Sequence, residues 1–375
     1  MKQREKKKKN IVLRVIVGIL IFVLFLVLVV CVTFGILYYK GKNNLLTKEA
    51  GPVVLETAPE TEPETTAAPE EDPLEEGEIS YNGNRYRYKD SLVNILCMGV
   101  DKKSLESGEK VYGKAGQADF IVLVSVDTDT GKITMTNISR ETMTDINLYS
   151  QSGRYVGTEE RQICLAYAYG DGAHASCENV ELAVSRLMYG IPIQAYAAVS
   201  ISAIPVINDA VGGVEVTLTE EAAGVLTDRC EGTYKAGDRV TLDGDQAYEF
   251  IHYRNWKGED APVDSNNARM ARQRQYITAF AGSVMEKTLS DPTIPVQLFD
   301  IVTDYTVTDL TVSDISYLSS VALQNGISRI NMETVPGEVS LGEDGYAQYR
   351  VDEEKLFQMV LTNFYEPKQV DSNEQ

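Results

Sequence analysis

An uninterrupted run of uncharged, mostly apolar residues at positions 15–39 restricts what the start of this chain can form. A helix of that length is long enough to cross the hydrocarbon core of a bilayer. The alternative is a cleaved signal peptide, whose apolar region is typically about 7–15 residues long and ends at a small-residue cleavage site. This run is longer and closes on Tyr38, Tyr39 and Lys40. The sequence therefore predicts an uncleaved, single-pass transmembrane anchor.

Basic residues gather on the N-terminal side of this run, with a lysine at every position from 6 to 9. By the positive-inside rule, residues 1–14 form a cytoplasmic tail and the chain after the anchor lies outside the cell. We therefore expect a protein of the cell membrane whose C-terminal part is extracytoplasmic.

Between positions 51 and 78 the chain is rich in Glu, Thr and Pro and has no aromatic residue, Lys or Arg. Such a composition cannot bury enough apolar surface to offset the entropy of the chain, and charge repulsion extends it. We therefore predict an acidic linker over 40–79 that holds the next domain off the membrane. The folded domain is expected over 80–368, followed by a short tail at 369–375.

The overall charge and the cysteines narrow the class of protein. A formal net charge of −20 over 375 residues argues against a nucleic-acid partner. The two histidines, His174 and His252, have no zinc-ligand spacing. Four cysteines follow the apolar run, and they could form disulfides in three ways or stay reduced. Because a domain of this size does not need disulfide bonds for stability, we expect buried free thiols at Cys97, Cys164, Cys177 and Cys230.

Helical and strand patterns alternate along the folded part of the chain. The predicted strands are 94–100, 119–126, 132–138, 194–200 and 214–218, and the predicted helices are 160–169, 177–189 and 353–364. The turn signal Asp-Thr-Asp-Thr-Gly joins the second and third strands as a hairpin. The mixture predicts an α/β domain with a mixed central β-sheet flanked by helices, in an α-β-α arrangement.

Cationic side chains converge from two segments of the stretch Tyr248–Tyr276. A short amphipathic run ends at Arg254, and a polar, turn-rich loop is expected over 255–267. In the helical pattern that follows, one face carries Arg269, Arg272, Gln273 and Tyr276. Arginines in this arrangement suit a polyanion such as a diphosphate, because guanidinium groups grip phosphate oxygens in pairs. An ordinary solvated helix face is the alternative.

Two carboxylates stand at strand ends, because Asp101 follows the first predicted strand and Asp119 opens the second. Adjacent strands would bring these ends together. Paired carboxylates without a nearby His or Cys in the sequence suit a hard divalent cation, and Mg²⁺ shared with a phosphate is the usual case. The alternative is that each aspartate merely ends a strand or caps a turn. Arg140 closes the third strand and could add a positive contact at the same sheet edge.

Several segments of the chain resemble the LytR-CpsA-Psr family in their order and spacing. They are NILCMGVD, DFIVLVSVD, ISRET, CLAYAYGDG, INDAVGGVEV, LDGDQAYEFIHYR and NARMARQRQY, which together cover about residues 94–279. The resemblance implies a membrane-anchored phosphotransferase of cell-wall assembly. Such an enzyme moves a teichoic acid, capsule or other wall polysaccharide from a polyprenyl diphosphate carrier to peptidoglycan and releases polyprenyl phosphate. It also implies a hydrophobic cavity for the prenyl chain between the sheet and its helices.

The same resemblance assigns roles to individual residues. Asp101 and Asp119 match the magnesium-associated aspartates, which implies Mg²⁺ as the cofactor. The implied catalytic residues are Asp101, Asp119, Arg140 and Arg272, and the implied diphosphate contacts are Arg140, His252, Arg254, Arg269, Arg272 and Gln273.

Three positions depart from the family pattern. Gln117 stands where an arginine often precedes the second aspartate, Glu141 replaces an aspartate, and His252 replaces the first arginine of an R-Y-R segment. Two other functions therefore stay open, a wall-polymer or polyprenyl-phosphate binding protein without turnover and a diphosphatase that uses water as acceptor. A transcription attenuator is disfavoured by the acidic charge and by the lack of a helix-turn-helix pattern.

Overall fold

The computed structural model describes residues 32–46, 74–75, 77–102, 105, 112–253, 261–325, 330–342 and 345–368, with the backbone alone at 261–267. Residues 1–31 of the expected tail and anchor, Arg254, and the tail at 369–375 lie outside this part of the chain. Within it, no helix combines the length and the apolar composition needed to span a bilayer.

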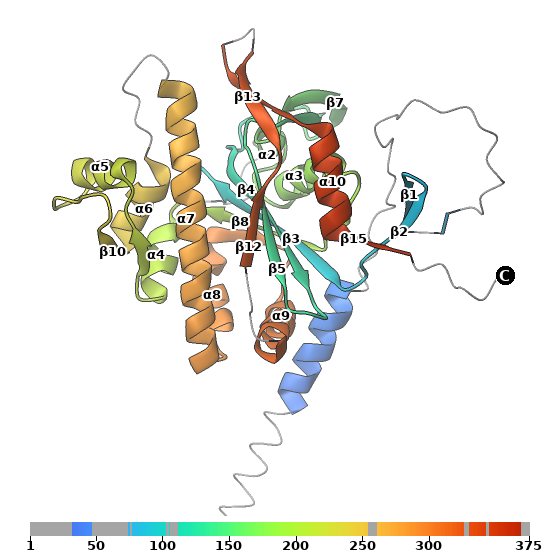
Figure 1. Ribbon diagram of the computed structural model, residues 1–375, viewed down its shortest axis with the longest axis horizontal. Helices are drawn as coiled ribbons and strands as arrows, with labels where there is room; N and C mark the ends of the chain where they lie inside the picture. Colours follow the sequence, from blue (N-terminus) through green and yellow to red (C-terminus); the bar gives the residue numbers. More distant parts are fainter. Residues whose placement is uncertain are drawn as a thin grey trace, which may run out of the picture.

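A six-stranded mixed sheet forms the centre of the molecule (Figure 1). Its strand order is β11-β8-β3-β4-β5-β12, with parallel pairing between β3 and β8 and between β5 and β12. The remaining neighbours are antiparallel, including the predicted β4–β5 hairpin. The strands are β3 (Leu92–Val100), β4 (Ala118–Asp127), β5 (Ile133–Ile138), β8 (Ala195–Ser200), β11 (Thr306–Thr308) and β12 (Ile330–Thr334).

Helices cover both faces of the sheet, which confirms the predicted α-β-α class. On one face, Ile121 and Leu123 of β4 pack into a core shared with α2 (Leu165–Ala168), α3 (His174–Leu187) and α10 (Glu353–Phe364). The alternate residues Val122 and Val124 face the other layer. That layer contains α4 (Ala203–Ala210), α6 (Gly244–His252), α7 (Ala261–Ser290) and α9 (Val312–Asn325).

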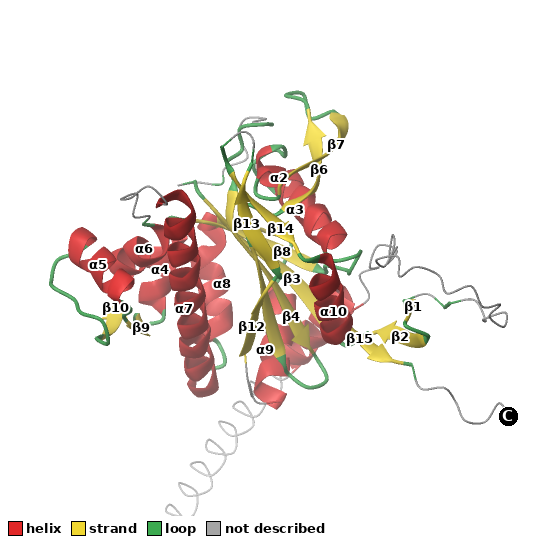
Figure 2. Cartoon of the chain, turned by 45° about the horizontal axis from the view of Figure 1, so that its top comes forward, coloured by secondary structure: helices red, strands yellow, loops and turns green. Residues whose placement is uncertain are grey.

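Smaller elements surround this three-layer body (Figure 2). Four small sheets flank it, formed by β1 (Glu78–Tyr81), β2 (Asn84–Tyr88) and β15 (Tyr365–Pro367), by β6 (Met143–Tyr149) and β7 (Tyr155–Gln162), by β9 (Val214–Thr217) and β10 (Arg239–Leu242), and by β13 (Gly337–Leu341) and β14 (Ala347–Val351). The remaining helices are α5 (Glu220–Arg229), α8 (Ile294–Val302) and the 3-10 turn η1 (Thr303–Tyr305).

A helix at 32–46 packs against α9 at the lower end of the sheet in Figure 1. Asn44 donates two hydrogen bonds to the carboxylate of Asp314, at 3.0 and 2.9 Å. The rings of Tyr38 and Tyr317 meet edge to face. A Cβ added at Gly41 would lie 2.1 Å from the Ser313 carbonyl oxygen, so the two backbones touch. The C-terminal part of the predicted anchor run therefore continues into a helix that is docked on the domain.

Most predicted elements are confirmed, and three boundaries differ. Residues 40–46 are helical and packed, so the expected linker does not begin before residue 47. The helix predicted at 160–169 is wrong in its first part, because strand β7 occupies 155–162 and only α2 is helical. The loop expected over 255–267 is shorter, since α7 begins at Ala261. All four cysteines in the described chain are free, as expected, but only Cys164 and Cys177 are buried, whereas Cys97 and Cys230 are half-buried.

Candidate active site

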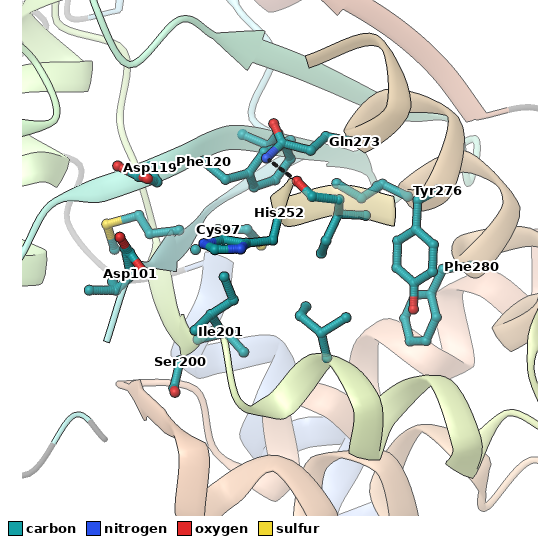
Figure 3. A pocket seen from close by; sticks show the side chains of 18 of the residues that line it. Cys97, Asp101, Asp119, Phe120, Ser200, Ile201, His252, Gln273, Tyr276 and Phe280 are labelled. Carbon is teal, nitrogen blue, oxygen red and sulfur yellow. Dashed lines mark hydrogen bonds between the residues drawn. The ribbon is translucent and has the colours of Figure 1, made fainter. Parts of the chain in front are cut away.

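A cavity of about 280 Å³ lies between the sheet and helices α4, α6 and α7 (Figure 3). Its walls are almost entirely apolar side chains, contributed by alternate residues of β4 and by single faces of the helices. The apolar lining is formed mainly by Phe120, Val122, Val124, Met135, Val199, Ile204, Ile207, Ile277 and Phe280. This is the cavity between the sheet and its helices that the family resemblance implies.

One end of this cavity is polar. Five side chains that the sequence singled out line it, namely Asp101, Asp119, His252, Arg269 and Gln273. The two aspartates meet because β3 and β4 are antiparallel neighbours, and the Asp101 amide donates to the Gln117 carbonyl oxygen at 3.4 Å. A cavity that is apolar along its walls and charged at one end suits an amphipathic ligand.

Local sequence explains how α6 and α7 bring their side chains to this end. The Asp243 side chain accepts from the Gln246 amide at 2.9 Å, and the Gln246 side chain accepts from the Asp243 amide at 3.1 Å. This capping box fixes the start of α6 and therefore the turn on which His252 lies. Gln273 of α7 donates to the Ile251 carbonyl oxygen at 3.2 Å and ties the two helices together.

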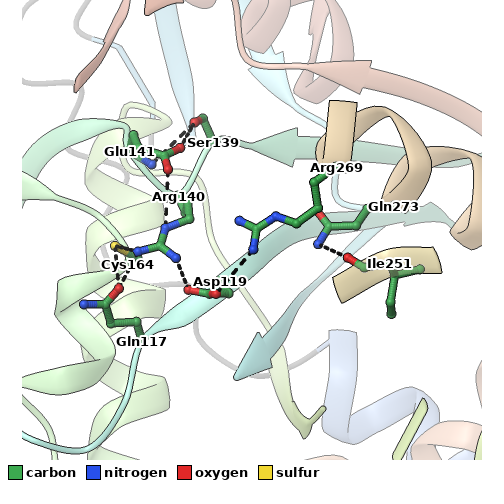
Figure 4. A network of polar contacts seen from close by, with 9 residues as sticks. All are labelled: Gln117, Asp119, Ser139, Arg140, Glu141, Cys164, Ile251, Arg269 and Gln273. Atoms are coloured by element: carbon green, nitrogen blue, oxygen red, sulfur yellow. Dashed lines mark hydrogen bonds and ion pairs between the residues drawn. The ribbon is translucent and has the colours of Figure 1, made fainter. Parts of the chain in front are cut away.

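Asp119 is held between two guanidinium groups (Figure 4). Arg140 forms a short ion pair with one carboxylate oxygen, and Arg269 lies 3.7 Å from the other. Arg269 is only 4% exposed, so water screens this charge pair weakly. Asp119 and Arg269 therefore form a fixed charge pair at the wall of the cavity.

Two of the three departures from the family pattern contact Arg140, and the third lines the cavity. Gln117 accepts a short hydrogen bond from Arg140, the residue that also binds Asp119. Glu141 lies 3.5 Å from the Arg140 Nε and accepts a hydrogen bond from the Ser139 hydroxyl at 3.0 Å. Gln117 and Glu141 thus orient Arg140, while His252 lines the cavity itself.

Arg272 does not line the cavity, although the sequence placed it beside Arg269 as a diphosphate contact. Its guanidinium donates to the Phe250 and Tyr253 carbonyl oxygens, and its Nε lies 3.0 Å from Glu221. Arg272 is 2% exposed, and burial lowers its pKa below the ordinary value. The structure therefore places Arg272 as a residue that fixes the end of α6. Arg254 lies outside the described residues.

The described side chains at the polar end supply only some of the oxygen ligands that a hard cation needs. In the described part of the chain, no group of three or more His, Cys, Asp or Glu side chains could hold a metal ion. The Asp101 carboxylate makes no hydrogen bond or ion pair within that part, whereas Asp119 already pairs with two arginines. Two carboxylates that share Mg²⁺ with oxygens of a bound diphosphate fit this donor set.

Two cysteines near the site are chemically quiet. Cys97 lines the cavity, and Cys164 lies 3.7 Å from a terminal nitrogen of Arg140. Burial raises the pKa of Cys97 to about 11 and that of Cys164 to about 11. Both thiols are therefore protonated near neutral pH and are poor nucleophiles. The site therefore does not favour covalent catalysis by cysteine.

The apolar lining was not identified as a site from the sequence. Phe120 and Val122 were read as part of a buried strand, and Tyr276 was read only as a member of the arginine-bearing face. The signal that could have found them is the apolar character of both faces of β4. A strand with apolar residues on both faces is covered on both, so alternate residues had to face either a core or a cavity.

Comparison with known proteins places this geometry in a family. The model of the LytR_cpsA_psr family matches residues 54–363. A polyisoprenyl-teichoic acid–peptidoglycan teichoic acid transferase TagU from Oceanobacillus iheyensis is 28% identical over 274 residues, which are 72% of this chain and 74% of its own. TagU from Enterococcus faecalis is 25% identical over 263 residues, which are 70% of this chain and 76% of its own.

A solved structure shares the fold of this chain. The structure of TagT bound to LI-WTA superposes with a TM-score of 0.54 at 17% identity, and the match covers 73% of this chain and 91% of that one. The chain belongs to the LytR_cpsA_psr family.

Proposed function

We propose that this protein transfers a glycopolymer from a polyprenyl diphosphate carrier to peptidoglycan and releases polyprenyl phosphate. The observation that carries the proposal is the cavity whose apolar walls end at charged side chains. A lipid-linked diphosphate has the matching character, with a long apolar chain and an anionic head. Relatives named as teichoic acid transferases support the same class of substrate.

In this proposal the prenyl chain lies along the apolar walls, against residues such as Val122 and Ile204. The diphosphate then lies at the polar end, within reach of Arg269, His252 and Gln273. Because Arg269 is buried, its charge acts on the diphosphate with little screening by water. Arg254, which the resemblance assigns to the same group, completes the proposed set.

Asp101 and Asp119 would hold Mg²⁺, directly or through water. When bound, such an ion neutralises negative charge on the diphosphate oxygens. The pairing of Asp119 with Arg140 and Arg269 has a role of its own here. It holds one guanidinium on each side of the carboxylate and so fixes where Arg269 meets the substrate.

The proposed reaction forms one bond and breaks one bond at phosphorus. A hydroxyl oxygen of an acceptor sugar attacks the phosphorus that carries the glycan. The bond from that phosphorus to the bridging oxygen of the diphosphate breaks, and polyprenyl phosphate leaves with both electrons of the bond. Arg269 stabilises the charge that develops on the transferring and leaving phosphates. The hydroxyl proton passes to the Asp101 carboxylate, which can act as a base only where it is not a direct ligand of the ion, because direct metal binding would lower its basicity.

The proposed location is the cell membrane, with the domain outside the cell. The uncharged run at 15–39 and the lysines at positions 6–9 support a single-pass anchor with a cytoplasmic N-terminus. The docked helix at 32–46 supports a short connection from that anchor to the domain. A protease-protection assay on cells or vesicles tests the orientation, and cleavage of the domain from the cytoplasmic side would contradict it.

The test of the transfer reaction uses the full chain in detergent with a short-chain polyprenyl-diphosphate glycan. Release of polyprenyl phosphate is followed with and without Mg²⁺ and with and without peptidoglycan fragments. The proposal expects release that needs both the metal and the acceptor, with glycan found on the fragments. Release without any acceptor would instead identify a diphosphatase, and donor binding without release would identify a holding protein.

A further inference from the structure

A second pocket lies on the other layer of the molecule, against the β6–β7 hairpin. Its volume is about 280 Å³, and two tyrosine rings form part of its wall. We propose that this pocket binds an uncharged sugar of the acceptor glycan, and thereby holds the acceptor strand for transfer. This inference rests on the proposed function for the identity of the acceptor. The pocket is lined by Tyr112, Tyr149, Gly170, Ala175, Glu178, Asn179 and Leu182.

The tyrosine rings form a continuous aromatic series along the hairpin. The ring centres of Tyr112 and Tyr149 are 6.3 Å apart, and those of Tyr149 and Tyr155 are 5.9 Å apart. Tyr155 continues the series out of the pocket and is 54% exposed. Tyrosine combines a flat apolar face with a polar tip, so it can lie against the C–H face of a sugar while its hydroxyl remains hydrated.

The backbone is adapted to present these rings. The β6–β7 pairing is irregular at Leu148 and Tyr149, and such a bulge redirects the side chain at that position. At the hairpin turn, Gly153 has a φ of +75°, and a Cβ added there would lie 2.8 Å from the Tyr112 ring. The turn thus needs glycine at position 153, both for its positive φ and because the Tyr112 ring packs directly against it.

The hairpin adds little to the core through its outer strand. Every residue of β7 is exposed except Gly157 and Gln162, which are half-buried, and Val156 is 65% exposed. Figure 2 shows β6 and β7 projecting from the top of the molecule. An exposed strand that carries an aromatic side chain beside a pocket is typical of a binding surface rather than of a stabilising element.

The polar groups of the pocket favour a neutral, hydroxyl-bearing ligand. Glu178 is exposed at the pocket and can accept hydrogen bonds from hydroxyl groups. Asn179 is 4% exposed and donates to the Asn147 and Ala166 carbonyl oxygens. Its Oδ1 is buried and accepts no hydrogen bond from any described residue. The Glu178 carboxylate would repel the phosphates of a donor polymer, so the chemistry favours the acceptor sugar.

Two short segments connect this pocket to the polar end of the first cavity. The chain from Tyr112 to Asp119 runs between them, held to α2 by a hydrogen bond from the Gly113 amide to the Ala168 carbonyl oxygen at 2.7 Å. Helix α2 runs alongside, with Cys164 near Arg140 before it and Gly170 at the pocket after it. The first segment advances seven residues and the second six. Six residues cover about 9 Å in a helix, and seven cover at most roughly 25 Å when extended. One glycan strand can therefore reach both sites.

The first experiment measures binding of an uncharged oligomer of N-acetylglucosamine to the full chain in detergent by calorimetry. It is repeated with Tyr149→Ala, with Tyr149→Phe as the matched control that keeps the ring, and with Ala175→Trp, which fills the pocket from a half-buried helix position. We expect the oligomer to bind the native chain and Tyr149→Phe, and to bind Tyr149→Ala and Ala175→Trp at least tenfold more weakly. No binding to the native chain, or equal binding to all four, would overturn the proposal.

The second experiment separates this pocket from the transfer reaction. In the polyprenyl phosphate assay, Tyr149→Ala should raise the KM for peptidoglycan fragments at least tenfold and leave the KM for the lipid donor unchanged. An unchanged acceptor KM would refute the acceptor role. A native chain that binds the oligomer but releases no polyprenyl phosphate would instead refute the proposed reaction and leave the sugar site established.

Discussion

Arg269 and Arg272 lie one helical turn apart on α7, and the structure predicts opposite consequences when each is removed. Arg269 lines the cavity beside Asp119, whereas Arg272 is buried against α6. We therefore expect Arg269→Ala to remove activity with little loss of stability. We expect Arg272→Ala to destabilise the fold first, and to lower activity only through that loss.

The expected loss of stability for Arg272→Ala follows from its contacts. Its guanidinium donates to two carbonyl oxygens, and hydrogen bonds from a charged donor contribute about 1.5–3 kcal/mol each. The ion pair with Glu221 adds little, because that carboxylate is 35% exposed. The sum is about 3–6 kcal/mol, and at roughly 2 °C per kcal/mol for a domain of this size the Tm falls by roughly 6–12 °C.

For Arg269→Ala the same reasoning gives a smaller figure. Asp119 keeps its ion pair with Arg140, so no buried charge is left alone, and we expect a loss of about 1–2 kcal/mol. The rate of polyprenyl phosphate release should fall by about 10²–10³-fold, as for a lost contact to transition-state charge.

The assay combines thermal unfolding with the rate of polyprenyl phosphate release for both variants. Arg274→Ala is the matched control, because this arginine is on the same helix and, among the described residues, its side chain forms a single hydrogen bond, of 3.4 Å, to the Thr334 hydroxyl. An Arg272→Ala protein with native Tm and no activity would refute its structural assignment. An Arg269→Ala protein with native activity would refute the placement of the diphosphate.

Three further outcomes are expected. Asp119→Asn removes the charge that Arg140 and Arg269 share, so release of polyprenyl phosphate should fall at least a hundredfold; a rate within tenfold of native would contradict this. Val122→Phe narrows the cavity, and the larger side chain should displace about three methylene groups of the bound prenyl chain. Each displaced group loses a burial free energy of about 0.8 kcal/mol. The KM for long-chain donors should therefore rise more than tenfold, and equal effects on short-chain donors would count against the cavity. Because burial raises the pKa of Cys97 to about 11, iodoacetamide should alkylate it far more slowly at pH 8 than an unfolded-protein thiol, and bound donor should slow it further; mass spectrometry measures both rates.

The strands of the central sheet were predictable because their apolar character is local. Residues 92–100 are mostly buried, and every residue of 118–127 is buried or half-buried. A short apolar run between turn signals needs no tertiary information to be recognised. Strand β7 was missed for the opposite reason. Its residues face solvent on both sides, so its charges show no period of two, while the apolar residues of α2 directly after it favoured a helix.

Most residues of the site could be predicted from the sequence, but which of them reach the cavity could not. Asp101 and Asp119 meet because β3 and β4 are antiparallel neighbours. The predicted hairpin joins β4 and β5 only, so the sequence does not indicate this neighbour relation. Helical spacing places Arg269 and Arg272 on one face, but which of them reaches the cavity depends on how α6 packs against α7. The pocket of Tyr112 and Tyr149 joins separate segments, and no spacing in the sequence links the two tyrosines.

The docking of helix 32–46 on α9 changes which part of the chain determines the distance of the domain from the membrane and its orientation. In sequence, the acidic segment at 47–73 connects this docked helix to residues 74–75, and Glu75 lies 3.5 Å from Lys368 of the same domain. A segment that starts and ends on one body does not act as a tether, so its length does not set the reach toward the wall. If the proposed anchor continues the docked helix without a break, the domain turns with that helix. One residue inserted near position 32 would rotate the cavity by about 100° around the membrane normal and raise it by about 1.5 Å.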